Sequence, residues 1–146
     1  MPEKRFMTGF SLVELMIVLV IASVLAAIAY PSYRDHLIRS AIPQATSGLS
    51  LYAMRLEEYY LDHHTYRQGA AATCAVAAPV PEQFRFSCST SNQGHSYLLT
   101  ATGLSGELAS FSFTLDQNGN ERTTSLPERW GTAPASCWIK KRPASC

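Results

Sequence analysis

The sequence is short of charge, and the charge that it has is nearly balanced. Only 16% of its 146 residues are Asp, Glu, Lys or Arg, against about 25% in an average soluble domain. Lys and Arg total 12 and Asp and Glu total 11, so the formal net charge is +1. This balance argues against a nucleic-acid binder that works through bulk charge and against an acidic disordered chain. The length suits one modest domain.

The sequence also lacks the patterns that usually mark catalytic and metal sites. The four cysteines all lie in the second half of the chain, and no two of them form a C-x-x-C pair. His63 and His64 are adjacent, so on a helix they would point about 100° apart, whereas a zinc pair stands at positions i and i+4. No nucleophile–base pair or phosphate-binding loop is recognisable. We therefore expect no enzymatic activity, no metal site and no cofactor.

Charged residues are scarcest in one long apolar run. Between Phe10 and Tyr30, which Pro31 follows, Glu14 is the one charged side chain. A helix of that length would span roughly 30 Å, the thickness of the hydrocarbon core of a bilayer. Apolar residues occur at every angle around this helix, so it must lie in lipid or at the centre of a bundle. The run therefore indicates a membrane or filament protein.

Two ordinary kinds of apolar segment are alternatives for this run. A secretory signal peptide has an apolar region of about 7–15 residues and a small-residue cleavage site, whereas this run is longer and continues into residues 30–34, Tyr-Pro-Ser-Tyr-Arg. A plain membrane anchor fits the length. It leaves the Glu14 carboxylate within the apolar segment. The free-energy cost of this placement is about 2.5–3.5 kcal/mol near the bilayer centre, and less toward the interface. A membrane-anchored binding domain that never polymerises stays open as an alternative.

The residues around Glu14 carry a more specific signal. A short leader with Lys4 and Arg5 ends at Gly9, and Phe10-Ser-Leu-Val-Glu14 then opens the apolar run. This arrangement resembles the class III signal of type IV pilins and pseudopilins. The resemblance implies that a prepilin peptidase cuts between Gly9 and Phe10, and that Phe10 becomes the N-methylated terminus of a subunit that assembles with other pilins.

Cleavage after Gly9 would give Glu14 an electrostatic partner. It creates a cationic α-amine at Phe10, which is near Glu14 within one helix and can approach the Glu14 of a staggered neighbouring subunit. Two unit charges about 4 Å apart attract by roughly 4 kcal/mol at an effective dielectric constant near 20, which is comparable to the cost of burying the carboxylate. We therefore expect Glu14 to fix the register of assembly.

Helical periodicity continues beyond Pro31. Apolar residues recur at steps of three and four: Ile38, Ala41, Ala45, Leu49, Tyr52, Leu56 and Tyr59. This spacing predicts one helix over residues 10–61, with an amphipathic second half. Pro31, Pro43 and Gly48 predict bends in it, and two separate helices meeting at Pro43 are the alternative.

These features divide the chain into a leader (1–9), a transmembrane or filament-core helix (10–31) and a globular head (32–146). The head is predicted to contain, in order, the amphipathic half-helix 32–61, a loop 62–94, a sheet 95–124 and a C-terminal loop 125–146.

The sheet is predicted from alternating apolar residues. Residues 95–102 and 108–115 alternate strongly, and Asn118-Gly119 is a hairpin signal that leads into a strand at 120–124. Residues 84–86 would add a short strand. We therefore predict an α+β protein, in which the long N-terminal helix packs on an antiparallel sheet of three or four strands; this is the type IV pilin fold that the resemblance implies.

The segment Asp116–Asn120 superficially resembles a calcium-binding loop. Its glycine stands at the fourth position rather than the sixth, and Pro127 occupies the place of the bidentate glutamate. We expect a turn here and no metal.

The four cysteines allow three pairings. Local pairing of Cys74 with Cys88 and of Cys137 with Cys146 would staple two loops, with each bridge contributing on the order of 3 kcal/mol. A zinc site is the alternative, although the spacings are irregular and an exported chain favours disulfides. Type IV pilins commonly close a C-terminal loop on the head with a disulfide, and Cys137 with Cys146 fits that position.

Residues 55–66 resemble the corresponding stretch of PilE-type minor pilins. The resemblance implies a minor pilin with roles in pilus biogenesis, twitching motility and adhesion. It also implies a single-pass inner-membrane protein with a periplasmic head before assembly, and an extracellular pilus afterwards. A pseudopilin of type II secretion, which shares the same N-terminus, is the alternative within the family.

A basic region near the C-terminus raises a further alternative, a DNA-uptake pilin. Two tryptophans, Trp130 and Trp138, stand among these cations and could stack bases. A solvated basic tail over packed tryptophans is the other interpretation. The candidate DNA contacts are Arg129, Lys140, Lys141 and Arg142.

Overall fold

The computed structural model describes residues 10–80 and 82–146. The predicted leader, with the cleavage position at Gly9, lies outside the described residues. The chain divides into two compact units, with the boundary between Leu37 and Ile38, and each unit is described by itself.

A single helix, α1, runs from Leu12 to His63. It passes through Pro31, Pro43 and Gly48 without interruption, so the alternative of two helices meeting at Pro43 is wrong. Its ends differ by two residues from the predicted range 10–61.

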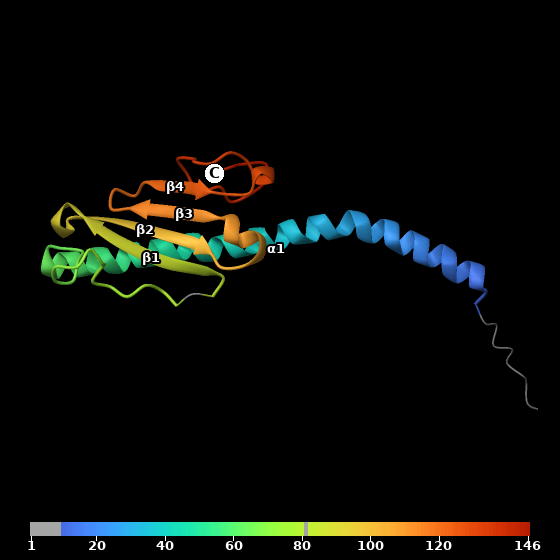
Figure 1. Ribbon diagram of the computed structural model, residues 1–146, viewed down its shortest axis with the longest axis horizontal. Helices are drawn as coiled ribbons and strands as arrows, with labels where there is room; N and C mark the ends of the chain where they lie inside the picture. The colour runs from blue at the N-terminus through green and yellow to red at the C-terminus, as the bar shows by residue number, and fades with distance from the viewer. Residues whose placement is uncertain (1–9, 81) are drawn as a thin grey trace, which may run out of the picture. The chain divides into compact units, whose positions relative to one another are not determined.

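The head contains a four-stranded sheet in which all neighbouring strands are antiparallel and follow the order of the chain, β1-β2-β3-β4 (Figure 1). The predicted α+β architecture is confirmed. The four strands are β1 (Phe84–Ser91), β2 (Ser96–Gly103), β3 (Ser112–Asp116) and β4 (Glu121–Ser125).

Two predicted strands have other limits in the structure. The short strand expected at residues 84–86 is the beginning of the eight-residue β1. Residues 108–110, expected in a strand, instead belong to a 3-10 helix, η2 (Gly106–Ser110). A Cβ on Gly103 would lie 1.8 Å from the Leu108 carbonyl oxygen. The backbone of η2 therefore folds directly onto the end of β2, and strand pairing begins only at Ser112.

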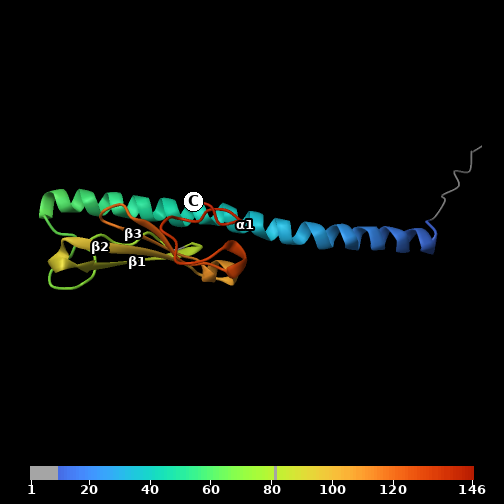
Figure 2. The same ribbon diagram turned by 90° about the horizontal axis from the view of Figure 1, so that it is seen from above.

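The core of the head lies between one face of the sheet and residues 38–63 of α1 (Figure 2). The strand residues that alternate toward the helix are buried, and each large apolar side chain removed from water contributes about 1.5–3 kcal/mol. The fully buried members from the two layers include Ile42, Leu49, Leu56, Phe84, Leu99, Phe111 and Phe113.

Gly48 lies at the closest contact between the helix and the sheet. A Cβ at this position would lie 2.3 Å from Cζ of Phe86. The ring of Phe86 therefore packs directly on the backbone of α1, which explains a glycine in the interior of a helix, where it otherwise costs about 1 kcal/mol relative to alanine.

The long loop before β1 is attached to the edge of the sheet. Thr73 forms an isolated bridge with Ser89, and the Thr90 N–H donates to the Ala72 carbonyl at 2.8 Å. The Cys74–Cys88 disulfide joins the same loop to β1. These links hold down a segment that would otherwise be an unusually long unsupported loop.

The C-terminal tail covers the outer edge of β4 (Figure 1). Thr123 and Ala135 exchange two backbone hydrogen bonds, of 3.0 and 2.9 Å. Cys137 and Cys146 form the second disulfide, which closes the last loop of the chain. Both predicted disulfide pairs are therefore present.

Candidate functional site

The first part of α1 presents apolar side chains in all directions. Phe10, just before the helix, and the large apolar residues of the helix up to Tyr30 are between 55% and 83% exposed. Among the residues that the structure describes, α1 alone is long and apolar enough to cross a membrane. A surface of this kind is not stable in water and requires lipid or neighbouring helices.

Glu14 lies in the first turn of this helix. The Glu14 N–H donates to Oγ of Ser11 at 3.2 Å, and the Leu15 N–H donates to the Ser11 carbonyl at 3.2 Å. Ser11 is therefore the N-cap residue, and α1 begins at Leu12 rather than at Phe10. This cap was not predicted, although the Ser-x-x-Glu spacing is its usual signature in a sequence. A carboxylate in the first turn also interacts favourably with the helix dipole.

The C-terminal loop presents a group of cations that we call the tail basic cluster: Arg39, Lys140, Lys141 and Arg142. The three residues of the loop are exposed, and its backbone is held by a hydrogen bond of 3.1 Å from the Lys140 N–H to the Ser145 carbonyl. Arg39 of α1 joins them because its Nη2 donates to the Arg142 carbonyl at 3.4 Å. Arg39 was not among the predicted contacts, because it lies about a hundred residues away in the chain.

The fourth predicted DNA contact, Arg129, has a different environment. It belongs to a 3-10 helix, η3 (Glu128–Trp130), and its guanidinium forms an ion pair with the carboxylate of Glu107. This ion pair offsets the charge that Arg129 would offer to a phosphate.

The alternative in which Trp130 and Trp138 stack bases is wrong, and the other interpretation, in which both tryptophans are packed, is confirmed. Trp130 is 0% exposed and its ring packs edge-on against Phe111. Trp138 is 4% exposed, and its Nε1–H donates to the Thr114 carbonyl at 3.0 Å. Large aromatic rings contribute most to stability when they are buried, and both tryptophans are used in the core of the head.

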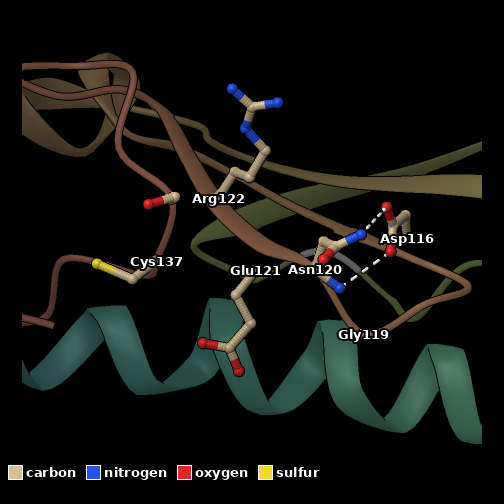
Figure 3. A pocket seen from close by; sticks show the side chains of 7 residues that line it. Asp116, Gly119, Asn120, Glu121, Arg122 and Cys137 are labelled. Carbon is tan, nitrogen blue, oxygen red and sulfur yellow. Dashed lines mark hydrogen bonds between the residues drawn. The ribbon is translucent and has the colours of Figure 1, made fainter.

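A cavity of about 640 Å³ lies between the β3–β4 turn and the tail (Figure 3). Its lining combines one guanidinium, that of Arg122, with the carboxylates of Asp116 and Glu121, so it offers no net positive charge to a phosphate. The other lining residues are Gly119, Asn120, Ser136 and Cys137.

Both carboxylate oxygens of Asp116 are used within the turn itself. Oδ1 accepts the backbone N–H groups of Asn118 and Asn120 at 2.9 Å, and Oδ2 accepts the Asn120 side chain at 2.8 Å. Partial burial opposes ionisation, but these hydrogen bonds from Asn120 and Asn118 outweigh it and lower the pKa of Asp116. Residues 116–120 form a turn, as predicted. Within residues 10–80 and 82–146 no group of three or more His, Cys, Asp or Glu residues is placed to hold a metal ion.

The end of α1 is joined to the sheet through Glu57. Its carboxylate accepts the hydroxyl of Tyr66 at 3.0 and 3.1 Å and that of Tyr97 at 3.1 Å. Burial, reinforced by the hydrogen bond and the charge of Glu57, raises the pKa of Tyr66 to about 12; burial and the charge of Glu57 also raise the pKa of Tyr97. These contacts connect the helix to the loop after it and to β2.

The adjacent histidines make local contacts at the end of α1. The His63 ring stacks on that of Tyr59 with a centroid separation of 3.9 Å, and His64 has a φ of 53° as the helix ends. This arrangement fits an ordinary helix end with packed aromatics.

Two family models match the chain. Residues 5–30 match "Prokaryotic N-terminal methylation motif", and residues 31–111, more than half of the chain, match "Type IV minor pilin ComP, DNA uptake sequence receptor".

Curated relatives of the chain are also pilus proteins. "Fimbrial protein EcpC" of Eikenella corrodens is 36% identical over 99 residues, which cover 68% of this chain and 64% of that protein. "Type IV major pilin protein PilE1" of Neisseria gonorrhoeae is 36% identical over 74 residues, which cover 51% of this chain and 34% of that protein. The chain therefore spans less than two thirds of the length of these two relatives.

A third relative belongs to a related system. "Type II secretion system core protein G" of Aeromonas hydrophila is 29% identical over 124 residues, which cover 78% of this chain and 87% of that protein. Three findings agree with one another: the matched family models, the long apolar helix with its methylation motif, and the disulfide-linked head. The chain belongs to the ComP family of type IV pilins, and pilin family proteins are structural subunits, not enzymes.

Proposed function

We propose that this chain is a minor pilin that is cleaved after Gly9, methylated on Phe10 and incorporated into a type IV pilus through its N-terminal helix. One observation carries the proposal. The first part of α1 exposes apolar side chains on every side, and the methylation-motif model matches this same segment. Such a helix fits lipid before assembly and a bundle of identical or related helices afterwards.

The subunit is proposed to occur in two stages, before and after assembly. Before assembly it is a single-pass protein of the inner membrane with its head in the periplasm, and a prepilin peptidase removes the leader. Afterwards it is part of an extracellular pilus, with roles in pilus biogenesis, twitching motility and adhesion. The two disulfides of the head suit these oxidising compartments.

Glu14 is proposed to set the register between neighbouring subunits. Its carboxylate is exposed in the first turn of α1, close in the chain to the α-amine that cleavage would create at Phe10. In a filament core of low dielectric constant this amine and the Glu14 of a neighbour would pair.

Mass spectrometry of the subunit tests processing and assembly together. Subunits from membranes and from sheared filaments should begin at Phe10, with one added methyl group. Recovery of the uncleaved chain from membranes, with no subunit in filaments, would instead support the membrane-anchored domain that does not polymerise.

DNA uptake is a second candidate function. Two observations favour it: the description of the family model that matches residues 31–111, and the exposed cations Lys140, Lys141 and Arg142. Cations of this kind bind phosphates without reading sequence. The ion pair of Arg129 with Glu107 offsets the charge that this residue would offer to a phosphate.

A titration with duplex DNA over a series of salt concentrations tests this candidate. The wild-type chain should bind more weakly as salt rises, and the variant Lys140→Gln/Lys141→Gln should show a salt slope that is smaller by about 2. Absence of binding at low salt excludes DNA uptake through this chain.

The similarity to a type II secretion core protein leaves the pseudopilin alternative to be tested. A subunit of a pilus should be recovered in sheared surface filaments and should be lost from them when pilus assembly is blocked. Loss of protein secretion with normal pili would identify a pseudopilin.

A further inference from the structure

The lysines of the head are concentrated at one place. Lys140 and Lys141 are the only lysines after Lys4 in the whole sequence, and both are exposed on the loop closed by Cys137 and Cys146. The loop has a fixed position on the head, because Ile139 is 2% exposed just before Lys140.

The helix contributes a further cation beside this loop. Arg39 donates from Nη2 to the Arg142 carbonyl, so the tail basic cluster combines one turn of α1 with the C-terminal loop. In the sequence Arg39 follows Tyr30, the end of the apolar run, by nine residues. Both residues belong to α1, and nine residues rise about 13 Å in a helix.

This distance places the cluster near the surface of any membrane that the apolar run crosses. The polar headgroup layer adds about 5–8 Å on each side of the hydrocarbon core. Arginine and lysine side chains extend several Å further toward it. The cations therefore come within reach of the phosphates of the leaflet from which the chain emerges.

The cluster lacks the stacking surface that a single-stranded nucleic acid needs. A single strand needs exposed aromatic rings for stacking, but Trp130 and Trp138 are buried.

We propose that the tail basic cluster binds anionic phospholipid headgroups while the subunit is stored in the membrane. This inference rests on the proposed membrane-stored stage. The contact would hold the head on the leaflet until the helix is withdrawn during assembly, and it would be weakened by salt, because the charges are exposed.

The lysines provide a direct readout in the full chain. The protein is inserted into lipid nanodiscs, either of phosphatidylcholine alone or of equal parts phosphatidylcholine and phosphatidylglycerol, and treated with a water-soluble lysine-acylating reagent. An anionic surface keeps nearby amines protonated, so acylation of Lys140 and Lys141 should be about three- to seven-fold slower with phosphatidylglycerol. High salt should remove the difference.

A matched variant separates docking from general attraction to the disc. Arg85 is exposed on β1, at the opposite edge of the sheet from the tail. Arg85→Lys therefore adds a reference lysine without changing the charge. Its acylation rate should be the same in both lipids, and equal protection of this lysine would overturn the proposal. Arg39→Gln should reduce the protection of Lys140 and Lys141.

The remaining outcomes also decide the question. Equal acylation of Lys140 and Lys141 in both lipids overturns the inference, and protection by duplex DNA alone would assign the cluster to nucleic acid. Failure of the chain to enter the nanodiscs, seen as elution apart from the lipid, would contradict the membrane-stored stage and hence the inference that rests on it.

Discussion

The hydroxyl of Thr123 donates a hydrogen bond of 2.7 Å to the carbonyl oxygen of Cys137. The hydroxyl oxygen of Thr123, Oγ1, in turn accepts a hydrogen bond of 2.9 Å from the Ile139 N–H. Thr123 is fully buried, and its backbone also pairs with Ala135. One side chain in the middle of β4 therefore fixes the tail on both sides of Trp138, and with it the loop that presents Lys140.

Replacing Thr123 by valine should loosen this tail. The change keeps the shape of the side chain but leaves the Cys137 carbonyl and the Ile139 N–H without their partner, which costs about 1–3 kcal/mol in the free energy of unfolding. Thr102→Val, at an exposed position of β2, is the matched control and should change the stability by less than about 0.5 kcal/mol. Urea unfolding in detergent measures both variants; equal stability of the two would contradict the assigned role.

Replacing Gly48 by alanine should destabilise the head, although alanine is the better helix former. The added Cβ would lie 2.3 Å from Phe86, so the ring or the helix must move, which costs about 1–3 kcal/mol. Ser47→Ala, at an exposed position one residue earlier, should be close to neutral.

The double variant Gly48→Ala/Phe86→Leu tests whether Phe86 is the cause. The smaller side chain should accommodate the new Cβ, so the two changes together should cost less than the sum of the single changes. Strict additivity would show that the loss in Gly48→Ala comes from elsewhere.

The tyrosines bound to Glu57 predict how stability depends on pH. Their pKa values are raised in the folded chain, for Tyr66 to about 12 from an ordinary value of 10.0. Between pH 10 and pH 12 the unfolded chain binds fewer of these tyrosine protons than the folded one. The contribution of the two tyrosines to the free energy of unfolding is therefore constant below pH 10 and falls as the pH rises toward 12.

The variant Tyr66→Phe/Tyr97→Phe should remove much of this alkaline loss. At neutral pH it should also be less stable by about 1–3 kcal/mol, because it lacks both hydrogen bonds to the carboxylate. Tyr59→Phe, which changes a ring outside this network, is the control. Denaturant unfolding between pH 7 and pH 12 measures all three chains, and an unchanged pH profile in the double variant would contradict this origin of the alkaline loss.

The fold was predictable from the sequence wherever a periodic pattern continued over many residues. The apolar spacing from Ile38 to Tyr59 identified the helix face that packs on the sheet, and the alternation in residues 95–102 identified β2 to within one residue. Residues 108–110 have the same alternation but form η2, because Gly103 lets the chain fold back on itself. That contact joins two separate segments and leaves no mark in the local pattern.

The candidate sites were predictable to different degrees for a similar reason. Glu14 and the processing motif are contiguous in the sequence, so they were found there. Arg39 joined the basic residues only through the folded tail, and the tryptophans looked available for bases because a sequence does not show which aromatic rings the core requires. The ion pair of Arg129 with Glu107 likewise depends on the packing of η3 near η2.

The proposed role of Glu14 predicts that its charge is needed for assembly and not for folding. Glu14→Ala removes the carboxylate but leaves the Ser11 cap, because the cap uses the backbone N–H of residue 14. The variant should enter the membrane and be cleaved normally, while its recovery in sheared filaments falls by about tenfold or more, as expected for the loss of an ion pair of a few kcal/mol. Glu14→Asp keeps the charge and should retain part of the assembly. Ser11→Ala, which weakens the helix start and keeps Glu14, is the control for a local structural effect. If Glu14→Ala filaments form at the normal level, the carboxylate does not set the register; if Ser11→Ala fails equally, the helix start and not the charge is what assembly requires.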